Sequence, residues 1–149
     1  MPRRATHSSV GATAGMVAAV YRVRAMPADH AVAAAVGGLL GGAIGGVVPD
    51  VLEPATHPNH RGFAHSAVAG GALVFAPVAE FEASCQAKAA AWDEAAGANP
   101  QGSAERSRAE LRAWLWRLLA GAAVGIVAGY ASHLVLDACT PRSLPLIGR

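Results

Sequence analysis

Two ionisable side chains stand inside the last apolar stretch of the sequence. His133 and Asp137 are four residues apart, so on a helix their side chains point from one face. Polar groups within apolar segments are costly and are usually functional. An imidazole and a carboxylate on one helical face are suitable ligands for zinc or another divalent metal. The alternative is a hydrogen bond that only satisfies two buried groups, and the spacing alone does not separate these interpretations.

A second group of potential ligands follows a glycine-rich apolar stretch. It comprises Asp50, Glu53, His57, His60 and His65. Such a density of histidines and carboxylates directly after a membrane-length segment predicts a metal or catalytic site, whereas the alternative is a solvated polar loop. His57 is the residue most typical of a plain loop.

Three further polar residues are ambiguous when taken singly. His7 stands alone near the start of a predicted helix, and His30 is typical of a surface residue close to a helix cap. Arg61 could hold a phosphate or carboxylate group, or lie at a lipid interface.

These side chains must be positioned by helices, and four helical segments are predicted. They cover about 8–23, 30–48, 63–91 or beyond, and 104–138. The polar stretch 50–62 is predicted to be non-helical, and 95–103 is predicted to be a loop. Prolines and capping side chains set these boundaries. The expected caps are Ser8 or Ser9, Asp29 and Ser103, the expected breaks are Pro27 and Pro49, and Pro77 is expected to kink its helix.

The second segment is the clearest membrane candidate, because residues 31–48 carry no charge and approach the ~20 residues that span a bilayer. Its glycines recur four apart, in the rows Gly37/Gly41/Gly45 and Gly38/Gly42/Gly46. Glycines in this pattern allow close packing of membrane helices. In water each would cost about 1 kcal/mol in helix formation.

The composition agrees with a membrane protein. Of the 149 residues, 53% are hydrophobic and only 15% are charged, while the mean hydropathy is +0.33. A typical soluble domain is about one quarter charged. Trp114, Trp116 and Arg117 are predicted to form an interfacial belt at the start of the last apolar stretch. We therefore expect residues 1–149 to form one all-α domain, a membrane-embedded bundle of about four helices with a metal-ligand cluster at helix ends.

Several other classes are disfavoured. The net charge is only +2, with no basic stripe or aromatic platform, so no nucleic-acid partner is expected. Cys85 and Cys139 are isolated, which predicts reduced thiols, and no cleavable signal peptide is evident. Basic residues flank most segments on both sides, so the sequence predicts a multi-pass inner-membrane protein without a firm topology or oligomeric state.

Taken together, the motifs resemble a known family. They are T-H-S at 6–8, V-P-D-V-L-E at 48–53, H-R-G-F-A-H-S at 60–66, and G-Y-A-S-H at 129–133 followed by Asp137 and T-P at 140–141. In order and context they resemble the YdjM-type family of inner-membrane-associated, metal-dependent hydrolases. The resemblance pairs Glu53, three residues after Asp50, with the second Asp of the family's P-D-x-D pattern. Ala64 replaces the Thr of H-R-G-x-T-H-S, and both departures bear on activity more than on metal binding.

The resemblance implies a set of site residues. The implied metal ligands are His7, Asp50, His65, His133 and Asp137, while Glu53, His60 and Arg61 are implied in catalysis. The expected cofactor is a divalent metal, zinc first and manganese second. Such a metal polarises a substrate oxygen and activates water, with Glu53 as the base and Arg61 stabilising negative charge. A loose similarity to the zinc-dependent phospholipase C group suggests a small-molecule or lipid-linked phosphoester substrate.

Two alternatives remain. One is a non-catalytic membrane protein, with a structural metal or only a His–Asp network, that acts through partners. The other is a soluble bundle whose apolar helices pack on each other, which carbonate extraction from membranes would support.

Overall fold

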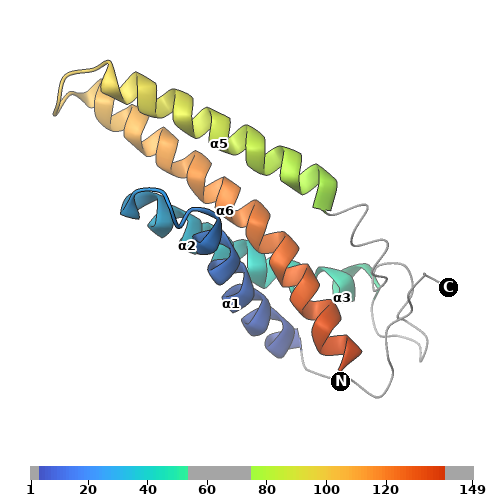
Figure 1. Cartoon of the computed structure of the whole chain (residues 1–149). Helices are drawn as coiled ribbons and strands as arrows, with labels where there is room; N and C mark the ends of the chain where they lie inside the picture. Colours follow the sequence, from blue (N-terminus) through green and yellow to red (C-terminus); the bar gives the residue numbers. More distant parts are fainter. Residues whose placement is uncertain (1–3, 54–74, 140–149) are drawn as a thin grey trace.

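The computed structural model describes residues 4–53 and 75–139, and all the regular secondary structure within them is helical (Figure 1). The helices are α1 (Arg4–Arg22), α2 (Ala28–Gly45), the short α3 (Val48–Leu52), α5 (Ala76–Gly97) and α6 (Ala104–Ala138). Four are long and α3 is a single short turn region, so the predicted all-α bundle of about four helices is confirmed.

The long helix α6 is the axis of the bundle. The helices α1 and α2 pack against its second half and against each other, while α5 runs back along α6 as the other arm of a hairpin (Figure 1). The tip of this hairpin projects beyond the turn that joins α1 to α2.

Small residues four apart bring α1, α2 and α6 together. The three rows are His7, Gly11, Gly15 and Ala19 on α1, Ala34, Gly38, Gly42 and Gly46 from α2 onward, and Gly121, Gly125, Gly129 and His133 on α6. A Cβ atom built on Gly11 or on Gly129 would meet the carbonyl oxygen of Gly42. The backbones of α1 and α6 therefore both touch α2 at Gly42, as the repeated G-x-x-x-G pattern predicts.

The second glycine row of α2 faces α6 as well. Cβ atoms on Gly37, Gly41 and Gly45 would meet backbone oxygens of Leu118, Ala122 and Ile126 respectively. Both glycine rows of α2 contact neighbouring helices. The larger side chains of α2 therefore lie on its outer face, where Val32, Leu40 and Ile44 are exposed.

The predicted start of the first helix is wrong. The helix begins at Arg4, and the Ser9 hydroxyl donates to the Ala5 carbonyl within the helix at 2.8 Å instead of capping it. Ser8 faces α2, where its hydroxyl lies 3.5 Å from the Ala43 carbonyl oxygen. Packing against α2 extends the helix past the local capping signal.

Two further boundaries around α2 differ from prediction. The N-cap of α2 is Pro27, and Asp29 lies in its first turn without a side-chain capping bond. Pro49 does not end helical structure, because it lies in the first turn of α3, which runs on to Leu52. A proline is tolerated in a first turn because its missing N–H would have no helical partner there.

The third predicted segment is described only in part, since residues 63–74 lie outside the described ranges. The helix α5 extends to Gly97, which agrees with the predicted end at Ala91 or beyond, and Pro77 occupies its first described turn. The predicted loop 95–103 is wrong at its start, because residues 95–97 are still helical. The last predicted helix, 104–138, is confirmed at both ends, and the Ser103 hydroxyl accepts a hydrogen bond from the Arg106 N–H at 3.1 Å.

Replacing Ser103 with alanine is expected to lower the free energy of unfolding by about 1 kcal/mol, because the first turn of α6 loses its acceptor. Thermal melting of the purified protein in detergent, followed by circular dichroism, measures the effect. Ser107→Ala is the matched control, because Ser107 is exposed within α6 and should tolerate the change. Identical melting of the two variants would contradict this role for Ser103.

Candidate metal centre

The site lies where the rows of small residues end. At one end of the bundle, His7 on α1 and His133 on α6 take the positions that glycine and alanine occupy along the rest of each row. Their rings stack with centroids 4.0 Å apart and planes at 28°. Both are buried, with 2% and 0% exposed. Imidazole coordinates a metal in its neutral form.

The His133 ring is oriented by the backbone of the neighbouring helix. Its Nδ1 lies 2.7 Å from the carbonyl oxygen of Gly46. Because a carbonyl can only accept, Nδ1 carries the hydrogen and donates the hydrogen bond, which makes Nε2 the metal-binding nitrogen of this ring. The close approach of α6 to α2 at the glycine row allows this hydrogen bond.

Two carboxylates face the same point as the two imidazoles. Asp137 places Oδ1 3.7 Å from His7 Nε2 and Oδ2 3.7 Å from His133 Nε2. Asp50 places Oδ1 3.7 Å from His133 Nε2. These separations exceed a direct hydrogen bond. They are close to the roughly 3.3 Å that separates two ligands of a tetrahedral ion whose bonds are about 2.0–2.1 Å long.

The donor set fits a divalent metal. The ligand atoms of His7, Asp50 and His133 all lie within 4.8 Å of one another, so this group could hold a metal ion. Within the described residues, Nδ1 of His7 is buried and has no hydrogen-bond partner. A buried nitrogen of this kind is satisfied by an ordered water or by an ion. Two imidazole nitrogens with carboxylate oxygens are a donor set for zinc and also suit manganese.

The short helix α3 brings Asp50 to the site. The helix α2 ends at Gly45, and after Gly46 and Val47 the chain restarts a helix with buried Pro49 in its first turn. Asp50 follows directly and keeps 21% of its side chain exposed, which is more than the other members of the cluster. The cluster is therefore most open beside α3.

The structure brings together some of the predicted site residues. His7, Asp50, His133 and Asp137 form one cluster, which joins the two motif groups at the ends of the chain with the one in its middle. Glu53 is half-buried at the C-terminal end of α3. The predicted site residues His60, Arg61 and His65 lie outside the described residues.

His30 lies outside the cluster, whereas the backbone carbonyl of Gly46 belongs to it. His30 is at the opposite end of α2, where its Nε2 lies 3.9 Å from an Asp29 carboxylate oxygen, so it is no part of the cluster. The carbonyl of Gly46 was not among the expected site groups, since a backbone acceptor has no signature of its own. The spacing of Gly125, Gly129 and His133 is the signal that could have indicated it, because it continues the packing row into the histidine.

The fold and the cluster define a small helical bundle with buried histidines and carboxylates at one end. Within the described residues, the stretches Ala28–Leu52 and Ala104–Ala138 are long and apolar enough to cross a membrane. The family model described as "YdjM inner membrane protein" matches residues 1–147. The chain belongs to this family of inner membrane proteins. Comparison with curated proteins and with solved structures gave no match.

Proposed function

We propose that this chain is a multi-pass, membrane-bound, metal-dependent hydrolase, formed by a single domain over residues 1–149. His7, Asp50 and His133 would hold zinc or manganese together with Asp137. The observation that carries the proposal is the convergence of two imidazoles and two carboxylates, drawn from α1, α3 and α6, on one point inside an apolar bundle. Ionisable groups in such surroundings are costly and are usually retained for function.

The residues of the cluster have separate tasks in this proposal. Gly46 fixes the tautomer of His133, and Asp137 faces both imidazoles, in a position to share a metal with them. Asp50 stands at the more exposed side, with Glu53 at the end of the same short helix, in a position to accept a proton. A bound divalent ion would supply Lewis-acid polarisation of a substrate oxygen. His65 is proposed as a further ligand, and His60 and Arg61 as catalytic groups, from the family motif.

The proposed substrate is a phosphoester, either a small molecule or one linked to a lipid. The location of the site at one end of membrane-length helices supports a substrate at the membrane boundary. Detergent-purified protein supplied with zinc or manganese is expected to hydrolyse chromogenic phosphomonoesters or phosphodiesters, or phospholipid in mixed micelles.

Asp50→Asn is expected to lower this turnover by at least about 100-fold, because a metal ligand matters no less than the outer groups whose loss costs about 10–100-fold. Asp29→Asn is the matched control, since Asp29 lies at the opposite end of α2. Wild-type turnover in purified Asp50→Asn protein would refute the proposal.

A second candidate is a structural metal in a protein that acts through partners. The burial of both histidines favours it, because structural zinc sites are closed whereas catalytic sites keep an open position. Bound metal without turnover of any phosphoester, combined with loss of folding when the metal is chelated, would favour this candidate over the hydrolase.

A further inference from the structure

Two polar contacts mark the two ends of the apolar part of the bundle. At one end, Arg117 on α6 lies 3.8 Å from an oxygen of Asp29 on α2 and also pairs with Asp93 on α5. At the other end, His133 on α6 donates to Gly46. Between Arg117 and His133 the helix rises about 24 Å, at about 1.5 Å per residue, which approaches the ~30 Å of a bilayer's hydrocarbon core.

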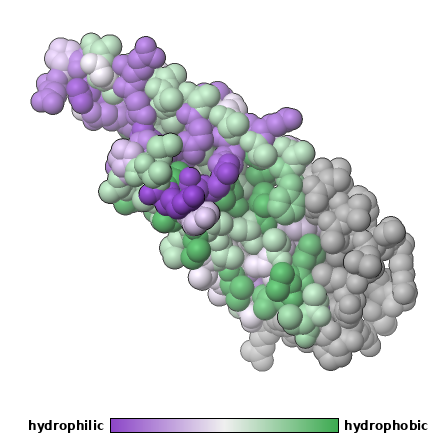
Figure 2. All heavy atoms as spheres, in the orientation of Figure 1, coloured by the Kyte–Doolittle hydropathy of each residue, from purple (hydrophilic) through white to green (hydrophobic). Residues whose placement is uncertain are grey.

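On α2 and α6 the outer surface between these contacts is apolar, whereas on the α5 side Arg22 and Glu82 form an ion pair beside Val124. The exposed side chains of the apolar surface include Val32, Val36, Leu39, Leu40 and Ile44 on α2, with Leu119 on α6. Figure 2 shows hydrophobic residues over the body of the bundle and hydrophilic ones over the α5–α6 hairpin and the α1–α2 connection. On the α2 face the two marker contacts therefore delimit an apolar band, and the metal centre lies at one edge of this band.

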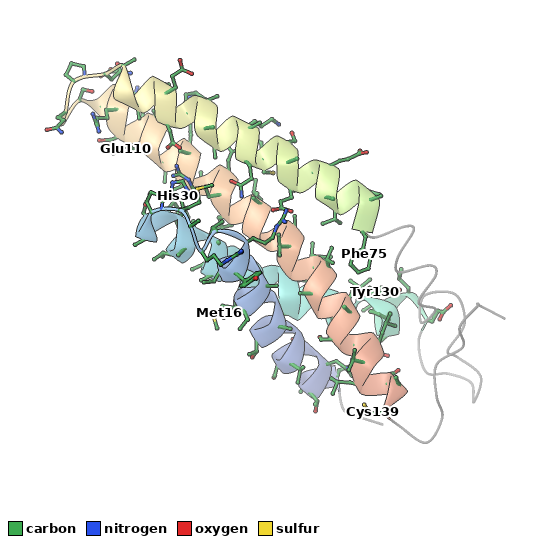
Figure 3. The ribbon with its side chains drawn as sticks, viewed as in Figure 1. Met16, His30, Phe75, Glu110, Tyr130 and Cys139 are labelled. Atoms are coloured by element: carbon green, nitrogen blue, oxygen red, sulfur yellow. The ribbon has the colours of Figure 1, made fainter. Side chains whose placement is uncertain are left out.

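The hairpin must extend into water. At 35 residues α6 is about 52 Å long, which is more than a bilayer's hydrocarbon core requires. The excess length precedes Arg117, where Arg106 pairs with Glu110 on the helix surface at 2.8 Å. Figure 3 shows His30 and Glu110 toward the hairpin end, and Cys139 at the far end of α6.

Most of the basic residues that the structure describes lie at the hairpin end. Among the described residues, the hairpin end carries Arg22, Arg24, Lys88, Arg106, Arg108, Arg112 and Arg117. The metal-centre end carries Arg4, while Arg3, Arg61, Arg142 and Arg149 lie outside the described ranges. Lysine and arginine near the ends of membrane spans are enriched on the cytoplasmic side.

We propose that the α5–α6 hairpin lies in the cytoplasm and that the metal centre is reached from the opposite, extracytoplasmic face of the inner membrane. The sequence alone could not assign this orientation, because basic residues flank most segments on both sides. The fold groups the α1–α2 and α5–α6 connections at one end, and their charges then act together. In taking the centre as the working site the inference rests on the proposed function, but it is tested by position and not by turnover.

The native cysteines provide a direct test in cells. Cys139 is exposed two residues after Asp137, whereas Cys85 is buried, so a Cys85→Ala protein reports on the metal-centre end through Cys139 alone. A cysteine-free Cys85→Ala/Cys139→Ala protein with Ser107→Cys reports on the hairpin. A membrane-impermeant maleimide is expected to label Cys139 in intact spheroplasts, and to label the Ser107→Cys variant only after permeabilisation. Labelling of the hairpin position in intact spheroplasts, with or without Cys139, would overturn the orientation.

A second measurement covers the case in which Cys139 does not react under either condition. A protease site inserted after Gln101, in the exposed turn at the hairpin tip, should survive protease added to intact spheroplasts and be cut in inverted membrane vesicles. The reverse pattern would overturn the orientation. Neither readout requires activity, so an inactive protein with this topology would refute the proposed function while leaving the orientation intact.

Discussion

Replacing His133 with asparagine is expected to remove metal binding while leaving the helix bundle folded. The asparagine amide nitrogen can take the place of the imidazole Nδ1 and donate to the Gly46 carbonyl, which His133 contacts at 2.7 Å. It has no counterpart to Nε2, the atom that faces Asp50 and Asp137. The affinity for zinc should therefore fall by at least about 100-fold, beyond the effect of losing an outer partner of a ligand.

Elemental mass spectrometry of the detergent-purified protein measures bound metal, and thermal melting reports folding. His133→Ala is expected to lose metal and to melt at a lower temperature, because the Gly46 carbonyl would then be buried without its donor at a cost of about 1–3 kcal/mol. His30→Asn is the matched control and should keep the wild-type metal content, since His30 lies at the other end of α2. Undiminished metal in folded His133→Asn protein would contradict the role of Nε2 as a ligand.

The second large effect is expected for Gly42→Ala. A Cβ atom there would meet the carbonyl oxygen of Gly11, and it would lie 3.0 Å from Cα of Gly15. Both are backbone atoms, which cannot rotate away as a flexible side chain does, so α1 and α2 must separate. We expect a loss of about 1–3 kcal/mol in stability, as for other overpacked sites. Metal binding should weaken as well, because His7 lies one helical turn from Gly11 on the same face of α1.

Gly97→Ala is the control for this substitution. A Cβ atom on Gly97 would meet nothing within 4 Å, so the variant should melt at the wild-type temperature or slightly above it. Melting in detergent and metal content are measured on both proteins. If Gly42→Ala melted with Gly97→Ala and bound the same metal, the glycine rows would not set the helix spacing that the site requires.

Much of the fold was accessible from local sequence signals. The bounds of α6 followed from Ser103 as its cap and from an unbroken helical stretch up to Ala138. The glycine rows of α2 indicated close packing, because glycines four apart share one helix face. The pairing of His133 with Asp137 followed from the same spacing, since one helical turn suffices to place both side chains together.

Local capping and helix-breaking signals gave wrong helix boundaries where packing between helices opposed them. Ser8 and Ser9 are good caps in isolation, yet α1 continues back to Arg4 because its first turns pack against α2 and α3. Pro49 is compatible with a helix end and with a helix start, and a local signal cannot choose between them. In the structure Pro49 lies at the start of α3, and this helix places Asp50 beside His133.

The sequence by itself determined the presence of four long helices, the faces on which small residues gather and the residue types available for a metal site. Only the tertiary structure decided that His7 stacks on His133 and that Gly46 orients the ring. A row of small residues repeating every four positions permits several registers between helices, each one turn apart. Packing of all three rows selects one register, in which the histidines meet at the same end of the bundle. The physical reason is that register depends on contacts between helices far apart in the chain, whereas sequence periodicity describes each helix alone.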